Sequence, residues 1–192
     1  MTEDWENGGF GIYIHWPFCT AKCPYCDFNS HVRSNIDQKQ WLKAYLNEIK
    51  RVSEKTSNRI LNSVFFGGGT PSLIEPSIIG DVLNEIQKHW KTKNNFEVTL
   101  EANPGSVDAK NFKAYKEAGV NRTSMGIQSL NTKDLKALGR THTVEEALAA
   151  FEIARQNFKA VSFDLMYARQ NQNINQWEKE LSLALSLEAS HM

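Results

Sequence analysis

The sequence predicts an α/β fold built on a parallel sheet. Short runs rich in β-branched and aromatic residues alternate along the chain with longer segments that have the apolar spacing of amphipathic helices. Such alternation indicates βαβ units, and five can be counted. Parallel strands in this pattern close toward a barrel, but a complete eightfold barrel needs about 250 residues. We therefore expect an incomplete TIM-like barrel, with a flavodoxin-like doubly wound sheet as the alternative.

Each predicted element rests on local signals. The strands are expected at residues 11–15, 63–66, 96–100, 121–127 and 160–166. The helices are expected at residues 41–52, 78–86, 107–118, 135–138, 143–156 and 174–187. The second helix begins after Pro76, while Gly119 and Gly139 end the third and fourth. Thr143 and Glu146 have the spacing of a capping box at the start of the fifth.

Composition limits the classes of partner. Lys plus Arg and Asp plus Glu both total 22, so the formal net charge is zero and no basic excess favours nucleic acid or a membrane surface. The acidic start of the chain lacks the apolar segment of a signal peptide, and no apolar run approaches the ~20 residues of a membrane span. Together with clustered free thiols, these features predict a cytoplasmic protein without a transmembrane segment.

The three cysteines carry the strongest functional signal. Cys19, Cys23 and Cys26 are separated by three and then two residues, so one loop can bring three thiolates to one metal centre. An iron–sulfur cube usually has four cysteine ligands, and a cube with three would leave one iron open to a small molecule. Open coordination positions make metal centres reactive.

Other interpretations of the cysteines remain. A disulfide would leave one thiol over, and a redox pair of Cys23 and Cys26 would leave Cys19 unexplained. His15 and His31 flank the run, and either could complete a zinc site with the three thiolates.

Polar residues follow the predicted strands at the edge where the chemistry of parallel α/β folds takes place. They are His15, the glycines and threonine at 67–70, Glu101, Asn103, Gln128, Asp164 and Tyr167. Consecutive glycines let the main chain approach a ligand and offer its N–H and C=O groups. Arg140 could pair with a carboxylate, and Tyr25 could stack on a flat ring. A ligand with ammonium, carboxylate, ribose and adenine groups would use all of these.

The cysteine spacing, with an aromatic residue before the third cysteine, resembles the radical S-adenosylmethionine superfamily. Longer runs resemble its oxygen-independent coproporphyrinogen III oxidase group, and within it the heme chaperone (HemW-type) branch. These runs are YIHWPFC at 13–19, CPYCDFNSH at 23–31, GGGTPS at 67–72, EANPG at 101–105, NRTSMGIQS at 121–129 and DLMY at 164–167. Oxidases of the group usually have a further cysteine where this chain has Phe28.

The resemblance implies a partial (βα)6 barrel with five units present, so that residues 1–192 form one core domain without the family's C-terminal part. It implies a 4Fe-4S cluster on Cys19, Cys23 and Cys26, with S-adenosyl-L-methionine on its open iron. The implied contacts of S-adenosylmethionine are Tyr13, Tyr25, Gly68, Gly69, Thr70, Glu101, Gln128, Arg140 and Asp164. The implied function is binding of heme as cargo and its transfer to an unidentified acceptor protein. The alternatives are oxidative decarboxylation of coproporphyrinogen III and a non-catalytic metal-binding module.

The chain departs from the family pattern in two places. Residues 168–171 are Ala-Arg-Gln-Asn where the family usually has Gly-Leu-Pro-Gly, and Asn157 stands where a glycine is usual. We therefore expect a changed turn at the cofactor edge. We also expect the last strand to lack a neighbour, so that Val161, Phe163 and Leu165 are partly uncovered. The isolated chain is then expected to aggregate and not to transfer heme.

Overall fold

Five parallel strands form the central sheet of the computed structural model, which describes residues 4–104 and 109–192. The strands are β1 (Phe10–Trp16), β4 (Ile60–Gly68), β5 (Lys91–Ala102), β6 (Arg122–Gln128) and β7 (Ala160–Leu165). They lie in the order of the sequence, β1-β4-β5-β6-β7, and neighbouring strands pair in parallel. In a doubly wound sheet the order of the strands reverses at an inner strand, so that later strands are added on the opposite side of the first one. The order therefore confirms the partial barrel and is not that of the flavodoxin-like alternative.

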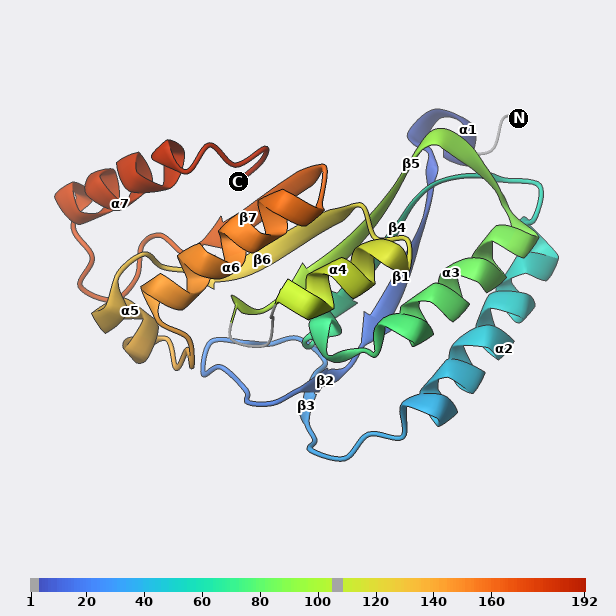
Figure 1. Cartoon of the computed structure of the whole chain (residues 1–192), viewed down its shortest axis with the longest axis horizontal. Helices are drawn as coiled ribbons and strands as arrows, with labels where there is room; N and C mark the ends of the chain where they lie inside the picture. The colour runs from blue at the N-terminus through green and yellow to red at the C-terminus, as the bar shows by residue number, and fades with distance from the viewer. Residues whose placement is uncertain (1–3, 105–108) are drawn as a thin grey trace.

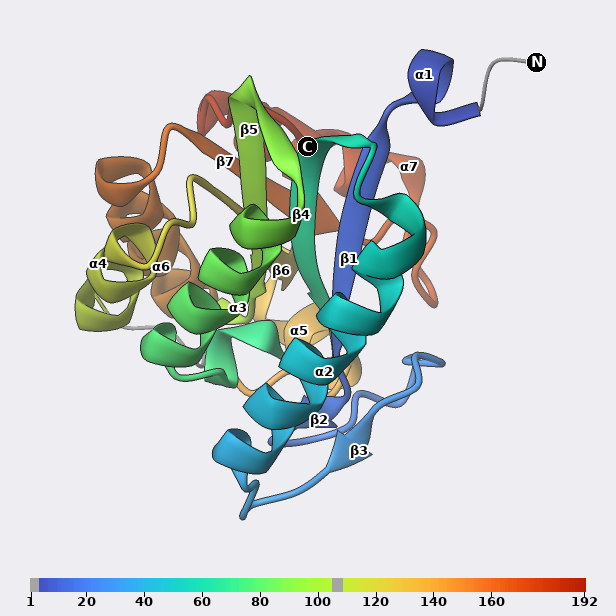
Figure 2. The same cartoon turned by 90° about the vertical axis from the view of Figure 1, so that its right-hand side faces the viewer.

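Helices cover one face of this sheet. α2 (Gln38–Thr56), α3 (Pro76–His89), α4 (Ala109–Glu117) and α6 (Val144–Asn157) pack beside one another along it (Figure 1; Figure 2). α7 (Ile174–Ser186) follows β7 and lies apart from that row (Figure 1). Within the described ranges, no helix is both long and apolar enough to cross a membrane.

Most helix ends follow the local signals in the sequence. The capping box forms, because Thr143 Oγ1 accepts from the Glu146 N–H at 3.2 Å and Glu146 Oε2 accepts from the Thr143 N–H at 2.7 Å. Gly119 and Gly139 end helices with φ of 112° and 67°. The helix predicted from residue 107 begins outside the described residues, and α4 is its described part. The short elements went unpredicted: α1 (Asp4–Gly8), β2 (Phe18–Cys19), β3 (His31–Val32), the 3-10 helix η1 (Pro71–Leu73) and the full extent of α5 (Thr132–Ala137).

The first half of β5 also went unpredicted. This strand begins at Lys91 rather than at residue 96. Leu61 of β4 pairs with Thr92, but Ser63 pairs with Glu97, so the register shifts between the two pairs. The polar residues in this irregular stretch lack the alternation that marks a strand, which is why sequence patterning does not reveal it.

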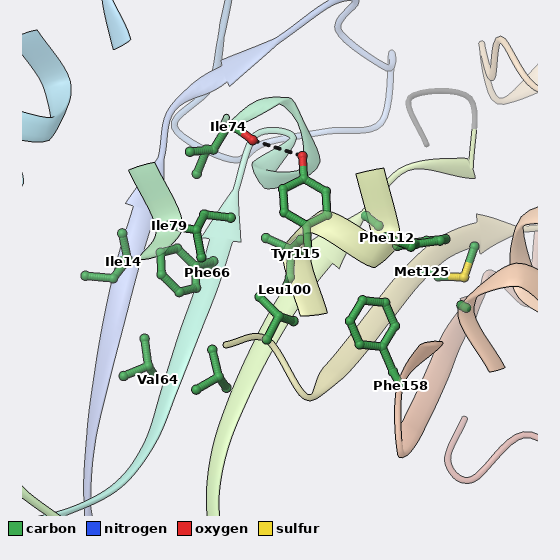
Figure 3. Close-up of a cluster of buried hydrophobic side chains, with 14 of the residues drawn as sticks. Ile14, Val64, Phe66, Ile74, Ile79, Leu100, Phe112, Tyr115, Met125 and Phe158 are labelled. Carbon is green, nitrogen blue, oxygen red and sulfur yellow. Dashed lines mark hydrogen bonds between the residues drawn. The ribbon is translucent and has the colours of Figure 1, made fainter. Parts of the chain in front are cut away.

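The core lies between the sheet and the covering helices (Figure 3). Phe66 of β4 and Leu100 of β5 are buried against Ile79 of α3 and Phe112 of α4. Buried residues alternate along the strands, as Val64 and Phe66 do, and recur at helical spacing, as Ile79, Val82 and Ile86 do. This is expected when one face of each element is buried.

The last strand is better covered than we expected from the sequence. Val161 and Phe163 are buried, and only Leu165 of the three named residues is partly exposed. Phe163 packs edge-to-face on Phe151 of α6, with ring centroids 5.5 Å apart. Ser190 Oγ accepts from the Val161 N–H at 3.0 Å and donates to the Val161 carbonyl at 2.7 Å. The expectation of uncovered apolar residues was therefore wrong for Val161 and Phe163, and the expectation that the chain does not transfer heme loses the support it took from them.

The turn after β7 keeps a tight path without glycine. Ala168 and Asn171 have φ of 54° and 62°, and they occupy the two positions where the family pattern has glycine. The Gln172 N–H donates to the Arg169 carbonyl at 3.0 Å and closes the turn. Asparagine tolerates this left-handed conformation, but for alanine it costs about 1–2 kcal/mol.

Tyr115 tests how far the core depends on one hydrogen-bonding group. Its ring is buried, and its hydroxyl donates to the Ser72 carbonyl at 2.6 Å. It also donates to the Ile74 carbonyl at 2.9 Å (Figure 3). Tyr115→Phe should lower the free energy of unfolding by about 1–3 kcal/mol, because two carbonyls lose a donor. Chemical denaturation measures this change. Tyr167→Phe is the control, because Tyr167 is 71% exposed, and an equal effect of both substitutions would contradict the prediction.

Candidate functional site

A cavity of about 400 Å³ opens at the carboxyl ends of the strands. All three cysteines line it, as do eight of the nine residues expected to contact S-adenosylmethionine: Tyr25, Gly68, Gly69, Thr70, Glu101, Gln128, Arg140 and Asp164. These residues come from the ends of β4, β5, β6 and β7, from the cysteine loop that begins at the end of β2, and from the segments that carry Thr70 and Arg140. The structure therefore brings together positions that lie up to 145 residues apart in the chain, from Cys19 to Asp164.

Tyr13 is the expected contact that does not line the cavity. It lies on β1, is 56% exposed and stacks on Phe65 with ring centroids 6.1 Å apart. Its hydroxyl lies 3.3 Å from His15 Nδ1. Partial burial raises the pKa of Tyr13, and the charge of Glu101 raises it further. Tyr13 thus stands beside the cavity and is electrostatically linked to it.

Backbone contacts close the base of the cysteine loop. Cys19 is the last residue of β2, which pairs with β3 beyond the loop. The His31 N–H donates to the Pro17 carbonyl at 2.7 Å, and the Arg33 N–H donates to the Cys19 carbonyl at 3.3 Å. His15 Nε2 lies 3.0 Å from the Asn29 carbonyl. A carbonyl only accepts, so His15 carries a proton on Nε2.

The glycine run joins β4 to the cysteine loop. The Gly69 N–H donates to the Trp16 carbonyl at 2.6 Å, and the Thr70 N–H donates to the Phe18 carbonyl at 2.8 Å. A Cβ on Gly69 would lie 2.5 Å from the Phe18 carbonyl oxygen, so only glycine allows this approach. The N–H of Gly68 donates to Glu101 Oε2 at 3.1 Å. We expected these N–H groups to serve a ligand, but all three have partners within the protein.

Arg140 contacts the cysteine loop directly. Its Nη1 lies 3.3 Å from Cys23 Sγ and 3.4 Å from the Tyr25 hydroxyl. Its Nη2 donates to Asn103 Oδ1 at 3.0 Å and to the Gly126 carbonyl at 2.8 Å. Nε is buried without a partner among the described residues. The carboxylate pairing expected from the sequence would therefore use Nε or require Arg140 to exchange partners.

Burial shapes the titration of the groups around the cavity. The pKa of Glu101 is raised, mainly by burial and further by the charge of Asp164, while the Gly68 N–H and His15 oppose the shift. Burial also raises the pKa of Asp164, although its side chain stays open to solvent in the cavity. Burial raises the pKa of Tyr25 to about 12, with Cys23 contributing and Arg140 opposing. The phenol of Tyr25 is thus neutral near neutral pH.

Gln128 adopts a conformation that its sequence context does not announce. Its φ is 71°, in the left-handed region that non-glycine residues rarely enter, and the pairing of β6 with β7 shifts register just before it. Residues held in such conformations cluster at ligand sites. The backbone strain here coincides with a position that lines the cavity.

Sequence reasoning missed several lining residues, among them Lys22, Ser30, Ser124, Gly126 and Met166. Strand alternation could have found two of them, because Ser124 and Gly126 share a face of β6 with Gln128. Ser30 follows a loop with no regular pattern, and nothing in its spacing marks it.

The lining has the chemistry of a cluster site with an open side. The three cysteines are free thiols, and Ser30 Oγ and Arg140 Nε are buried lining donors without partners in the described part of the chain. No three His, Cys, Asp or Glu side chains in the described ranges are grouped to hold a single metal ion. A cube binds each thiolate to a different iron, so its cysteines need not meet at one ion. Three free thiols that line one cavity therefore fit a cluster.

Comparisons with known proteins agree with the family resemblance of the sequence. A family model, described as the Radical SAM superfamily, matches residues 13–184. The heme chaperone HemW of Haemophilus influenzae is 42% identical over 187 residues, which cover 94% of this chain and 49% of that protein. The heme chaperone HemW of Escherichia coli is 36% identical, covering 94% and 48%. The mitochondrial radical S-adenosyl methionine domain-containing protein 1 of Danio rerio is 37% identical, covering 94% and 41%.

A solved structure has the same fold. The coproporphyrinogen III oxidase HemN of Escherichia coli, described as a radical SAM enzyme, aligns with a TM-score of 0.83 at 24% identity, over 93% of this chain and 42% of that one. The chain thus spans about half the length of the proteins it matches. The family model covers most of the chain, and the chain belongs to the radical SAM superfamily.

Proposed function

We propose that this chain is a radical S-adenosylmethionine core that binds a 4Fe-4S cluster and acts in heme delivery as a chaperone. The observation that carries the proposal is the loop of three free cysteines opening on a cavity lined by eight of the residues expected to bind S-adenosylmethionine. Relatives at 36–42% identity are named heme chaperones. We assign residues 1–192 to one core domain, and clustered free thiols favour a reducing location such as the cytoplasm.

The side chains around the cavity divide into three roles in this proposal. Cys19, Cys23 and Cys26 would hold the cluster, which when bound supplies a reducing electron and an open iron position. Glu101 and Asp164 would accept hydrogen bonds from ammonium and hydroxyl groups of S-adenosylmethionine. Because their pKa values are raised, both carboxyl groups lose their protons at a higher pH than an exposed carboxyl does.

The remaining contacts orient the ligand. Gln128 offers an amide that can both donate and accept, and Arg140 offers its buried, unpartnered Nε to a carboxylate. Tyr25 presents a neutral ring for stacking. Tyr13, Gly68, Gly69 and Thr70 complete the proposed set, the last three through their position in the cavity wall.

Coproporphyrinogen III oxidation is the alternative function. The likeness to HemN supports the fold alone, because the identity is 24%. Phe28 lines the cavity where the related oxidases usually have a further cysteine, and this favours the chaperone proposal. A non-catalytic metal-binding module is the third candidate, and metal analysis separates it from the other two.

The first prediction concerns the cluster. Anaerobic reconstitution with iron and sulfide should give about four irons per chain, the content of a cube. Cys23→Ala should lose nearly all of this iron, because two thiolates do not retain a cube. Iron analysis and visible absorbance measure both results. Thr20→Ala serves as the control, because it changes the same loop and leaves all three thiols in place. Zinc in place of iron after reconstitution would reject the proposal.

The second prediction concerns S-adenosylmethionine. Glu101→Gln removes the charge while keeping an acceptor for the Gly68 N–H. It should weaken binding by about 1.5–3 kcal/mol, the contribution of a hydrogen bond to a charged group. Equilibrium titration of the reconstituted protein measures the affinity. Glu97→Gln is a matched control on β5, because Glu97 accepts from Thr99 and does not line the cavity. Equal affinities in both variants would remove Glu101 from the site.

The third prediction separates the two heme-related functions. The reconstituted chain should bind heme, seen as a shifted absorbance band, and pass it to apomyoglobin faster than free heme in buffer enters that acceptor. Under anaerobic, reducing conditions with S-adenosylmethionine it should leave coproporphyrinogen III unchanged. Decarboxylated product would favour the oxidase alternative. Absence of both heme binding and decarboxylation would reject a heme-related role for these residues.

A further inference from the structure

A buried ion pair lies behind the cavity and has no role in the function proposed above. Arg169 follows β7 and Glu180 lies on α7, and each side chain is only 7% exposed. Arg169 Nη2 donates to Glu180 Oε2 at 2.5 Å and to Asp134 Oδ2 at 2.7 Å. Removing two charges from water carries a large penalty, so a buried pair is weak evidence for stability by itself. The pair therefore calls for an explanation in terms of what it holds in place.

One side of the pair holds the residues after Gln128. Glu180 Oε1 accepts from the Ser129 hydroxyl at 2.6 Å and from the Leu130 N–H at 2.7 Å. Ser129 is fully buried, so water does not compete for its hydroxyl. The chain leaving Gln128 is thus attached to α7 by a carboxylate with charge-assisted bonds.

The other side of the pair holds Gln128 through Met166, the residue that follows β7. The Met166 N–H donates to the Gln128 carbonyl at 2.9 Å. The Met166 carbonyl in turn accepts from the guanidinium of Arg169. The contacts form a closed ring that runs from Gln128 through Met166, Arg169 and Glu180 back to Ser129.

Gln128, a member of this ring, is the residue with the strained backbone. Gln128 has φ of 71° and lines the cavity. A non-glycine residue stays in this conformation only when its surroundings enforce it. Gly126 is also close, since a Cβ there would lie 2.9 Å from Gln128 Nε2. The hydrogen bonds of the ring hold the backbone of Gln128 in this conformation without any contact from a ligand.

A branch of the same network reaches Arg140. Asp134 lies on α5, and the chain that leaves this short helix turns at Gly139 into Arg140. The Arg140 N–H donates to the Leu135 carbonyl at 2.9 Å, which fixes the turn to the helix. Arg169 therefore holds both the strand end that carries Gln128 and the helix that leads to Arg140.

We infer that Arg169 and Glu180 are positioning residues that preset Gln128, and through Asp134 the segment carrying Arg140, for S-adenosylmethionine. This inference rests on the function proposed above. Neither residue lines the cavity, so their effect passes through the residues they hold. Mutation of the outer partners that orient metal ligands typically costs 10–100-fold in affinity, and we expect the lower end of this range for residues that orient Gln128.

Arg169→Gln in the full chain tests the inference, with Arg155→Gln as the matched control. Arg155 lies on α6 and bonds to Glu152 and to the Leu187 carbonyl, at 3.4 Å and 3.2 Å, rather than to the ring around Gln128. Both variants are reconstituted anaerobically, and iron content, melting temperature and the dissociation constant of S-adenosylmethionine are measured. The electron paramagnetic resonance spectrum of the reduced cluster is recorded with and without S-adenosylmethionine.

Arg169→Gln should keep the iron content of the parent and raise the dissociation constant about tenfold. Its cluster spectrum should no longer change at a concentration of S-adenosylmethionine that saturates the parent. Arg169→Lys should restore part of the affinity, because it restores the charge. The control should match the parent. A residue that only stabilised the fold would lower the melting temperature and leave the dissociation constant unchanged.

Two outcomes would overturn the inference, and they are distinguishable. If the parent binds S-adenosylmethionine and a folded Arg169→Gln binds it equally well, the positioning role is wrong while the proposed function stands. If the parent itself does not bind S-adenosylmethionine, the proposed function fails and this inference fails with it. Should Arg169→Gln not fold, the double variant Arg169→Met and Glu180→Gln removes both buried charges, and equal binding by that variant would be equally decisive.

Discussion

The close approach of β4 to the cysteine loop is the constraint on which the rest of the site depends. Two backbone bonds, from Gly69 to Trp16 and from Thr70 to Phe18, join the end of one strand to the segment leading into Cys19. The approach is closer than any side chain at position 69 would allow. The loop has little regular structure of its own, so these bonds and the short pairing of β2 with β3 set where its thiols lie. The bonds between the end of β4 and the residues at the end of β1 and in β2 thus hold the loop in place without a ligand.

The later strands add charged and polar groups to a frame that is already set. Glu101 is tied to the glycine run, Arg140 to the cysteine loop, and Gln128 to α7 through its neighbour. Each of these three residues is therefore held by a contact that a ligand need not supply. Preorganisation of this kind lowers the ordering entropy that binding must overcome. Among the buried atoms of the lining in the described ranges, Ser30 Oγ and Arg140 Nε have no partner within the protein.

Sequence patterns predicted the strand order and most of the lining, because both follow from the position of residues in βα units. Strand ends of a parallel sheet converge on one edge, so residues such as Glu101 and Asp164 could be placed without coordinates. The patterns did not reveal the left-handed Gln128 or the use of the glycine N–H groups within the protein, since both depend on distant segments meeting. They also misjudged the turn at 168–171. The sequence there lacks glycine, yet Ala168 and Asn171 take glycine-like conformations, and Arg169 joins a buried network that no local pattern announces.

The sequential order of the strands has a consequence for how the protein forms during synthesis. Each strand of the central sheet pairs with the preceding strand of the same sheet, so no strand must wait for a much later one before it can pair. The backbone bonds that anchor the base of the cysteine loop are complete within the first 70 residues, since Thr70 is the last residue among them, whereas the contacts of Arg140 with Cys23 and Tyr25 come later. Domains fold from the N-terminus as the ribosome releases them. The base of the cysteine loop can thus be anchored while Gln128, Arg140 and Asp164 are still to be translated.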